Sequence, residues 1–584
     1  MRKAKIVCTL GPASDDRGTV RALADAGMSV ARLNASHGSR EDRAALVDTV
    51  RRVDDAIAAP LAAMVDLQGP EVRTAPVDEP IDLPTGATVR FVEGDAATAE
   101  EIGLSYSIAA VDPGDAVLLD DGRIEARVES VEGDAVVAAI ESGGELGSRK
   151  GVNVPGVDLD VDLVTEKDRR DIELAVEKEV DFVAASFVRS ASDVYEVSDA
   201  IEESGMEIPV VAKIERAGAV ENVDEIIEAA YGVMVARGDL GVELPLEDVP
   251  IIQKRIIKRA QAAGTPVITA TEMLDSMVRA RRPTRAEASD VANAVLDGTD
   301  AVMLSGETAV GDHPVRVVET MDRIVREVES SPEYDESTEQ RVPSAAEDSR
   351  TEALARSGRY LARDVGAAAV VAVSESGYTA RRTAKFRPGV PVVATTPNDR
   401  VRRQLALSWG VNPQYSSYSR GVEEILEGAV DAALDAGVAE SGDTVVVLSG
   451  MMSELDGTST TNMLKVHVAA EAIATGREIV GGRVAGPLCR ASDGDLRELP
   501  EGAVLYLPAE FEGEFVGDPA KLGGIVDARP GMTGYAAVVA RELDLPMITG
   551  APVADSVADG TTVTLHAARG IVYEGNVIEH ERQR

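Results

Sequence analysis

The chain has 584 residues, enough for about four domains, and it carries 101 acidic residues against 59 basic ones. Its net charge of −42 and its lack of a basic patch argue against a nucleic-acid partner. No apolar run approaches the roughly 20 residues that a membrane span needs. The acidic residues are spread along the whole chain and lysine is rare. We interpret this composition as adaptation to molar salt, in which the Debye length falls to about 3 Å; an ordinary acidic protein is the alternative.

The two cysteines, Cys8 and Cys489, are far apart in the sequence and form no disulfide framework. This pattern fits a reducing compartment. The first residues run directly into a predicted strand, without the charged and apolar regions of a secretory signal. We therefore expect a cytoplasmic location.

Eight apolar runs occur before residue 310, and seven of them end in polar or charged residues. In a (β/α)8 barrel the strands fill the interior and their C-terminal ends face the substrate. The runs therefore predict such a barrel; the alternative is a set of unrelated buried strands. With their polar ends, the runs cover residues 6–10, 31–37, 65–73, 184–187, 210–215, 233–239, 267–272 and 302–307.

The pattern changes after Arg73. Residues 74–154 contain many Gly, Asp, Pro and β-branched residues in short alternating runs, which indicates a small β-domain inserted after the third barrel strand. The polar and acidic residues 330–350 indicate a linker. Beyond it, buried strands such as 369–373 and 444–448 indicate an α/β domain.

The residues at the strand ends suggest one class of reaction. Lys213 and Glu215 are two apart on a strand, so their side chains point to the same face. Asp239 ends the next strand, where it can meet Glu215 as a two-carboxylate site for Mg²⁺. Lys213 beside such a metal would place two positive centres where a phosphoryl group transfers. The alternative, a surface or structural ion pair, disagrees with the position of Lys213 at the end of an apolar run.

Together these residues resemble the pyruvate kinase family over most of the chain. Several long motifs in the right order are a strong signal, unlike any single short pattern. The matching segments are residues 5–14, 28–38, 213–215, 234–241, 282–287 and 289–309.

The resemblance implies an enzyme that transfers the phosphoryl group of phosphoenolpyruvate to ADP, giving pyruvate and ATP. It also implies an α/β fold with four parts. These are a (β/α)8 barrel of residues 1–73 and 155–330, an inserted β-barrel lid of residues 74–154, a regulatory α/β domain of residues 345–470, and an extra swivelling phosphohistidine-like domain of residues 475–580.

By similarity, Lys213 stabilises the transferring phosphoryl group and the developing enolate, and Arg32 holds the substrate phosphate. Glu215 and Asp239 bind Mg²⁺ or Mn²⁺. Gly238 and Asp239 offer backbone N–H groups to the substrate carboxylate, which suits the start of a short helix.

Thr271 is also similar to a substrate contact, near the face where the enolate is protonated. Thr271, Ser305 and bound water are candidates for that proton relay, and the sequence does not choose among them. The resemblance assigns the nucleotide contacts to Asn34, Ala35, Ser36, His37, Arg73 and Lys150.

A K⁺ site is implied as well. Leu67 and Gln68 resemble the K⁺-independent branch of the family, which has a lysine where Glu71 stands. A lysine could replace the charge of the cation and a glutamate cannot, so we predict K⁺ dependence. The matching K⁺ ligands are Asn34, Ser36, Asp66 and the carbonyl oxygen of Leu67.

Residues 374–379 resemble the loop that grips an effector phosphate in regulated members, although a plain strand-to-helix turn is the alternative. Residues 450–454 lack the arginine of relatives activated by a sugar bisphosphate, which argues against that effector; another phosphorylated effector, or none, is the alternative. In the last domain, residues 530–543 resemble the phosphohistidine motif, but Tyr535 replaces the histidine. Tyrosine supplies no imidazole nucleophile, so we expect this domain to be structural or regulatory.

Two further interpretations are weaker. One is a fragment of a phosphoenolpyruvate synthase or pyruvate phosphate dikinase, which the missing histidine and ATP-grasp region disfavour. The other is a regulatory or scaffolding homologue without activity, which the presence of Lys213, Glu215 and Asp239 disfavours. A homotetramer is implied by the resemblance alone.

Overall fold

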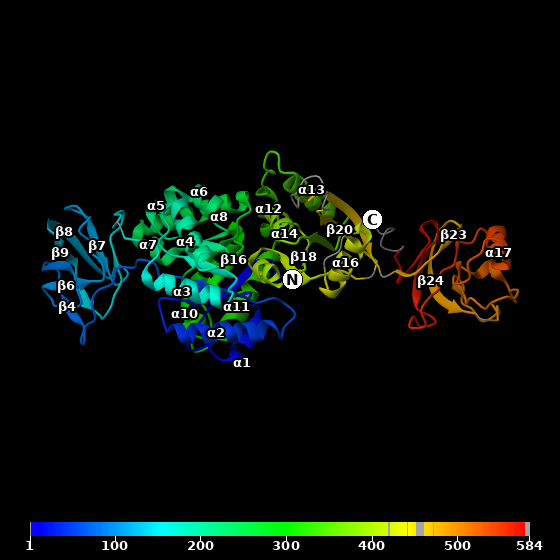
Figure 1. Cartoon of the computed structure of the whole chain (residues 1–584), viewed down its shortest axis with the longest axis horizontal. Coiled ribbons are helices and arrows are strands. Elements are labelled where there is room, and N and C mark those ends of the chain that lie inside the picture. The colour runs from blue at the N-terminus through cyan, green and yellow to red at the C-terminus, as the bar shows by residue number, and fades with distance from the viewer. Residues whose placement is uncertain are drawn as a thin grey trace. The chain divides into compact units, whose positions relative to one another are not determined.

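The structure is a computed structural model, which describes residues 2–159, 161–417, 421–440, 442–450, 461–470, 472–491 and 493–577. Its elements are labelled in Figure 1. The chain divides into two compact units. The first comprises Met1–Glu347, Ser376–Arg387 and Asn398–Pro413, and the second comprises Asp348–Glu375, Pro388–Pro397 and Gln414–Arg584.

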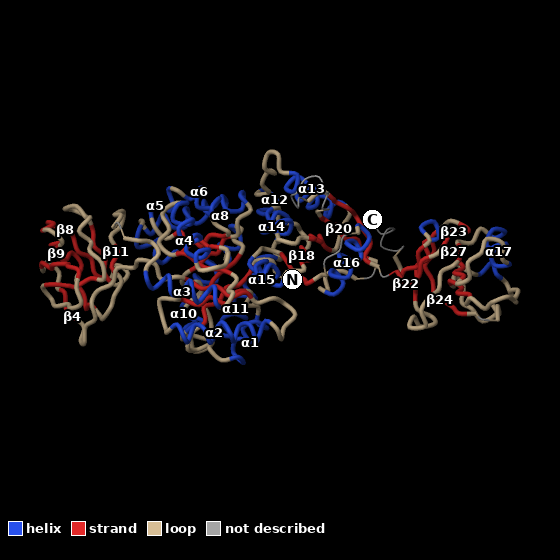
Figure 2. Tube along the Cα trace, viewed as in Figure 1, coloured by secondary structure: helices blue, strands red, loops and turns tan. Residues whose placement is uncertain are grey.

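The first unit contains a closed barrel of eight parallel strands in the order β1-β16-β15-β14-β13-β12-β3-β2. Figure 2 shows these strands enclosed by helices. The predicted barrel is thus confirmed. Its strands are β1 (Lys5–Leu10), β2 (Val30–Asn34), β3 (Ala62–Asp66), β12 (Phe182–Ala185), β13 (Val210–Ile214), β14 (Gly232–Ala236), β15 (Val267–Ala270) and β16 (Ala301–Leu304).

Several of the surrounding helices begin at residues that cap a helix N-terminus well. Capping boxes, in which a Ser or Thr and an acidic residue three positions later satisfy each other's backbone N–H groups, start α2, α3 and α9. The main barrel helices are α1 (Arg17–Ala26), α2 (Arg40–Asp54), α3 (Glu166–Glu177), α4 (Ala191–Glu203), α5 (Ala217–Glu221), α6 (Val223–Ala229), α7 (Arg237–Glu243), α8 (Val249–Ala263), α9 (Arg285–Asp297), α10 (Gly306–Ala309) and α11 (Pro314–Glu329).

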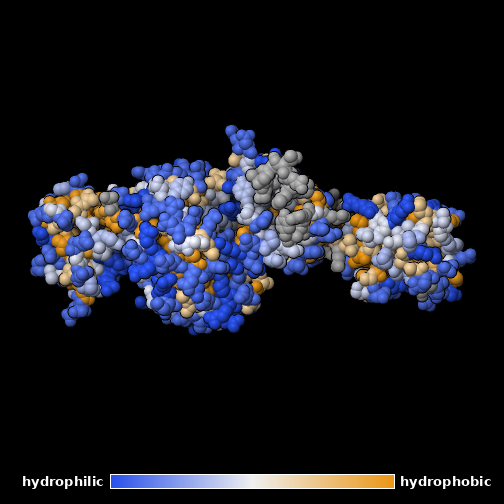
Figure 3. Space-filling model, viewed as in Figure 1, coloured by the Kyte–Doolittle hydropathy of each residue, from blue (hydrophilic) through white to orange (hydrophobic). Residues whose placement is uncertain are grey.

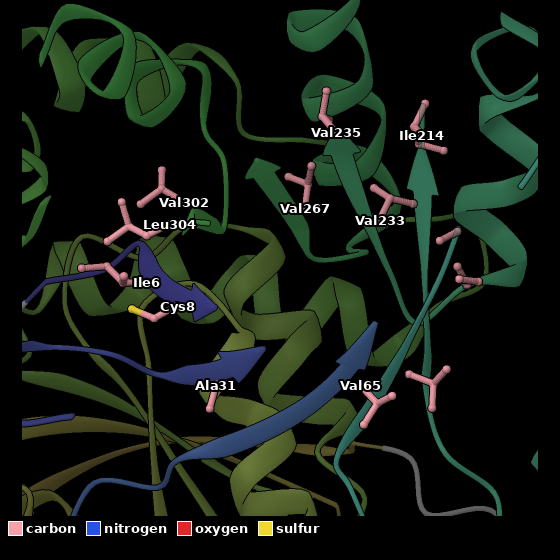
Figure 4. Close-up of a cluster of buried hydrophobic side chains, with 14 of the residues drawn as sticks. Ile6, Cys8, Ala31, Val65, Ile214, Val233, Val235, Val267, Val302 and Leu304 are labelled. Carbon is pink, nitrogen blue, oxygen red and sulfur yellow. The ribbon is translucent and has the colours of Figure 1, made fainter. Parts of the chain in front are cut away.

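Alternate residues of the strands build two apolar layers. One lies between the strands and the helices, as Figure 4 shows for residues such as Ile6, Val65 and Val235. The other fills the barrel interior and includes Met64 and Phe182. The barrel is therefore a packed core, and only the strand ends remain for chemistry.

The interior layer also includes Leu407, from a segment that follows the barrel in the chain. This segment contains α15 (Asp399–Gln404) and η3 (Leu405–Leu407) and belongs to the first unit, as does α14 (Tyr378–Lys385). The indole Nε1 of Trp409 donates a hydrogen bond of 3.0 Å to the hydroxyl of Tyr334.

Tyr334 lies in the region predicted as a linker, and that prediction is wrong for part of the segment. Residues Pro332–Gln340 form helix α12, and Tyr334 is buried in it. Ser331 caps the helix and proline stands in its first turn. A buried aromatic residue and a hydrogen bond of 3.2 Å from Ser337 to the carbonyl of Leu296 thus order a mostly polar segment.

The inserted residues form β-sheets of their own. A six-stranded sheet has the order β11-β7-β8-β9-β5-β6, and β10 pairs with β4. The chain leaves and re-enters the barrel at adjacent points, since Arg73 and Gly151 form an antiparallel bridge. The strands are β4 (Ile81–Leu83), β5 (Thr88–Glu93), β6 (Glu101–Leu104), β7 (Ala116–Leu119), β8 (Ile124–Glu132), β9 (Ala135–Ser142), β10 (Gly144–Leu146) and β11 (Val152–Asn153).

Two sheets follow in the C-terminal part of the chain. The first sheet has the strand order β19-β18-β17-β20-β21. The second sheet has the order β22-β29-β28-β24-β25-β26-β27-β23. The predicted fold class is confirmed. The elements are α13 (Arg350–Asp364), β17 (Ala369–Val373), β18 (Val392–Thr396), β19 (Val411–Tyr415), α16 (Val422–Asp435), β20 (Asp443–Ser449), β21 (Met463–Ala469), β22 (Ala472–Thr475), β23 (Arg477–Val480), β24 (Arg483–Arg490), β25 (Val504–Leu507), β26 (Gly524–Asp527), α17 (Tyr535–Leu543), β27 (Met547–Thr549), β28 (Thr562–His566) and β29 (Ile571–Glu574).

The face of the molecule in Figure 3 is largely hydrophilic over the barrel helices, as the acidic composition leads one to expect. Both cysteines are buried and free. Among the described residues, no helix has the length and apolar character needed to cross a membrane.

Candidate active site

Side chains at the C-terminal ends of the barrel strands line a cavity of about 220 Å³. It gathers residues that are far apart in the sequence because neighbouring strands place their ends together; Asn34, for example, is aligned with Asp66 across β2 and β3. The predicted site residues that line it are Arg32, Asn34, Ser36, His37, Leu67, Arg73, Lys213, Glu215 and Asp239.

The remaining predicted residues lie outside that lining. Gly238 precedes Asp239 in α7, and Thr271 follows β15. Ser305 lines a second cavity, described below. Lys150 is ion-paired to Asp120 at 2.8 Å within the inserted domain. Ala35 donates its backbone N–H to the carbonyl of Asp66 at 2.8 Å.

Lys213 is the centre of a buried charged cluster. Its Nζ atom lies 3.0 Å from Glu215 Oε2 and 3.9 Å from Asp66 Oδ1. Burial opposes the charge of the ammonium group, but the carboxylates of Asp66, Glu215 and Asp239 outweigh that effect and raise the pKa of Lys213. Lys213 is therefore a fixed positive charge at neutral pH.

Glu215 is held in place by its surroundings. Its Oε1 atom accepts a hydrogen bond of 2.6 Å from the backbone N–H of Phe187. Burial raises the pKa of Glu215 to about 7, with Lys213 opposing this rise and Asp239 adding to it. Phe187 has a φ of +60°, a conformation that a bulky residue rarely adopts and that aims its N–H at Glu215.

Two buried carboxylate oxygens, Glu215 Oε2 and Asp66 Oδ1, make no hydrogen bond. Both oxygens pair with Lys213 Nζ, at 3.0 and 3.9 Å, and a carboxylate oxygen has a second lone pair with which it can bind a metal cation. The described residues contain no cluster of three or more His, Cys, Asp or Glu side chains that could hold a metal. Glu215 and Asp239, which line the same cavity, are two carboxylates that could hold a divalent ion.

Arg32 is oriented by two neighbours. Its Nε donates to Asp66 Oδ2 at 2.6 Å, and its Nη1 donates to the hydroxyl of Thr9 at 2.8 Å. This buried pair fixes the plane of the guanidinium group at the rim of the cavity. Thr9 was not singled out by the sequence, because a threonine within a strand gives no signal of its own.

Ser186 is a second residue that the sequence did not assign. Its hydroxyl accepts a hydrogen bond of 2.9 Å from Lys213 Nζ and donates one of 2.7 Å to the carbonyl oxygen of Leu67. Ser186 therefore joins the charged cluster to the loop that follows β3. The carbonyl of Leu67 is one of the predicted K⁺ ligands.

The other predicted K⁺ ligands lie beside it. Asn34 Oδ1 accepts the backbone N–H of Ser36 at 3.0 Å. Glu71 is ion-paired with Arg73 at 2.8 Å, where the inserted domain begins.

A larger cavity of about 820 Å³ adjoins the first at Arg32, Asn34 and His37. Both polar and apolar side chains line it. The apolar lining was not predicted, because it comes from loops that meet only in the fold. Its lining includes Thr9, Gly11, Pro12, Ser305, Gly306 and Val310.

A (β/α)8 barrel with a buried lysine, an arginine and carboxylates at its strand ends defines an enzyme built for phosphoryl transfer. The comparisons with known proteins agree. The family model for the pyruvate kinase barrel domain matches residues 1–318, and that for the pyruvate kinase α/β domain matches residues 352–467. The model for the mobile domain of PEP-utilising enzymes matches residues 499–570.

Relatives match over nearly the whole length. The pyruvate kinase of Geobacillus stearothermophilus is 41% identical over 98% of this chain and 99% of its own. Those of Bacillus licheniformis and Staphylococcus aureus (strain MRSA252) are each 40% identical over the same shares. The chain belongs to the pyruvate kinase family. It is a kinase that transfers the phosphoryl group of phosphoenolpyruvate to ADP, giving pyruvate and ATP.

Proposed function

We propose that this reaction takes place around Lys213, with Mg²⁺ or Mn²⁺ bound by Glu215 and Asp239. The observation that carries this proposal is the buried Glu215 carboxylate, which lies 3.0 Å from Lys213 Nζ and lines the same cavity as Asp239. A bound divalent ion would supply a Lewis acid at this point. Lys213 adds a second positive charge, which stabilises the charge that develops on the phosphoryl group and the enolate.

The other side chains bind and orient the substrate. Arg32 is held by Asp66 and Thr9, so its guanidinium group is ready to bind the phosphate without reorganisation. By similarity to the family, Gly238 and Thr271 contact the rest of phosphoenolpyruvate. Thr271, Ser305 or water then protonates the enolate.

ADP would occupy the larger cavity, which meets the charged one at Asn34 and His37. Its apolar lining suits a nucleoside, and its junction with Arg32 places the phosphates beside the charged cluster. Arg73 lines the smaller cavity. Lys150 would join the phosphates when the inserted domain closes over the substrate and excludes water.

K⁺ would be bound by Asn34, Ser36, Asp66 and the carbonyl of Leu67. The buried Asp66 Oδ1, which accepts no hydrogen bond and lies 3.9 Å from Lys213 Nζ, supports this site. Glu71 brings no positive charge that could replace the cation.

The test is pyruvate formation from phosphoenolpyruvate and ADP with Mg²⁺, in KCl and in NaCl of equal ionic strength. We expect activity in KCl alone. Equal activity in both salts would overturn the K⁺ site and keep the reaction. Lys213→Met should lose activity in KCl while it retains its fold and Mg²⁺ binding, and Lys258→Met, at an exposed position of α8, serves as its control.

The chain would act as a homotetramer in the cytoplasm, where the last step of glycolysis takes place. Leu246, in the short 3-10 helix that precedes α8, and Ile251, in the first turn of α8, support self-association, because they are apolar and 73% and 67% exposed. Closed, symmetric assemblies are the rule for such enzymes.

The C-terminal domain would have no second catalytic role. Tyr535 begins α17 and packs edge-on against Phe515, with ring centroids 5.3 Å apart. No phosphoenzyme should therefore form with labelled phosphoenolpyruvate. An effector phosphate at residues 374–379 remains a proposal from the sequence, and residues 451–454 of the neighbouring motif lie outside the described residues.

A further inference from the structure

Arg237 stands immediately before Gly238 and Asp239, yet its guanidinium group contacts a different strand end. Its Nε donates to the carbonyl of Ala270 at 3.0 Å, and its Nη2 donates to the carbonyl of Thr271 at 2.8 Å. Its Nη1 donates to Asp290 Oδ1 at 2.7 Å. Two of the three nitrogens thus hold the end of β15 and the turn that follows it, while the third is anchored to Asp290 on α9.

That turn has an unusual backbone. Thr271 has a φ of +78° and Glu272 a φ of +52°. The left-handed region is unfavourable for residues other than glycine, and most of all for a β-branched one such as threonine. A conformation of this kind persists only where the surroundings enforce it, and such positions cluster at functional sites.

The position of the Thr271 side chain depends on this backbone. An added Cβ atom on Gly238 would lie 2.7 Å from Thr271 Cγ2, so the threonine packs directly against the start of α7. A change in the Thr271 backbone would therefore move its hydroxyl relative to Gly238 and Asp239.

We propose that Arg237 is a positioning residue, which enforces the left-handed backbone of Thr271 and so sets the position of its side chain, hydroxyl included, beside Gly238. The inference rests on the proposed contact of Thr271 with the substrate. The rigid fork of a guanidinium group can bond two consecutive carbonyls and a carboxylate at once. The single ammonium group of a lysine does not reproduce this geometry, so Arg237→Lys keeps the charge and removes the constraint.

The chain offers a matched control. Arg2 bonds the carbonyls of Ala4 and Gly27 and also pairs with Asp322, but it does so away from the site. Arg237→Lys should lower kcat about tenfold or more and leave KM for ADP unchanged, whereas Arg2→Lys should leave kcat unchanged. Melting temperatures of both variants show whether each remains folded.

A double-mutant cycle with Thr271→Ala decides whether Arg237 acts through Thr271. We expect Arg237→Lys to reduce kcat by less than about twofold in the Thr271→Ala background, because the hydroxyl to be positioned is gone. Asp290→Asn removes one anchor of Arg237, so it should also reduce kcat in the wild-type background and much less in the Thr271→Ala background. It replaces Arg237→Lys if that variant does not fold. Equal reductions of kcat in both backgrounds, or an unchanged kcat in Arg237→Lys, would overturn the inference. Wild-type enzyme that forms no pyruvate would instead overturn the proposed function.

Discussion

At the scale of single residues, the active site depends on buried side chains that hold the charged ones in place. Ser186 is 4% exposed and has two partners, Lys213 and the carbonyl of Leu67. A buried hydroxyl with two such bonds fixes both partners at once. It therefore links the group that stabilises the phosphoryl group to the loop proposed to bind K⁺.

Removal of the Ser186 hydroxyl should affect both phosphoryl transfer and the binding of K⁺. We expect Ser186→Ala to lower kcat about tenfold, because Lys213 and the carbonyl of Leu67 each lose a buried partner. The K⁺ concentration for half-maximal activity should rise, as measured by titration with KCl at constant ionic strength.

Ser186→Thr keeps a hydroxyl and should recover part of both losses. Ser198→Ala removes a hydroxyl that bonds only its own helix, so it should match the wild type. A normal K⁺ titration curve for Ser186→Ala would contradict the link.

The sequence predicted some of these residues and could not predict others. Lys213, Glu215 and Asp239 follow from strand periodicity and from ends that share one face of a barrel. Ser186 and Arg237 act through contacts between non-consecutive segments and through positive φ angles. Neither property leaves a pattern in one stretch of sequence.

At the scale of secondary-structure elements, the first strand contains a buried charge at its N-terminal end. Lys5 begins β1, and its Nζ donates to the carbonyl of Val411 at 2.6 Å. Burial, assisted by the charge of Arg2, lowers the pKa of Lys5 to about 7. In the unfolded chain the pKa of lysine is about 10.4.

Stability should therefore depend on pH through this residue. Between about pH 7 and pH 10 the unfolded chain binds more protons at Lys5 than the folded one, so its contribution to stability rises with pH. The melting temperature of the wild type should rise relative to that of Lys5→Met over this range. The melting temperature of Lys258→Met, at an exposed position of α8, should change with pH as that of the wild type does. If the melting temperatures of Lys5→Met and the wild type changed equally with pH, the pKa of Lys5 would not be lowered in the folded chain.

Helix α12 shows where element prediction failed. Composition indicated a linker, since most of its residues are polar and Tyr334 is the buried residue among them. The partner of Tyr334, Trp409, is 75 positions farther along the chain. A local pattern cannot reveal an order that a distant residue imposes.

At the scale of the whole molecule, the net charge of −42 sets the dependence on salt. Concentrated KCl would screen the repulsion among surface carboxylates. We expect the melting temperature to rise by about 5 °C or more from dilute buffer to concentrated KCl. NaCl should give a similar rise, which separates screening from K⁺ binding. An unchanged melting temperature would show that the acidic surface is no salt adaptation.

Assembly can be tested at the exposed apolar pair. Leu246→Asp places a charge where a second subunit is proposed to bury an apolar side chain, so it should lower the molar mass found by light scattering. Tyr195→Asp alters another exposed residue, on α4, and should leave the mass unchanged. Retention of the full mass by Leu246→Asp would place the interface elsewhere.

Leu407 has a consequence for how the protein is made. It lies in the barrel interior with residues from β1 to β16, although it comes about a hundred positions after the last strand. A ribosome that has released residue 310 has delivered every strand but not the side chain that completes their core. The interior of the barrel is therefore completed only after the nascent chain has grown past Leu407, so the downstream segment must be translated before the catalytic half has its full native core.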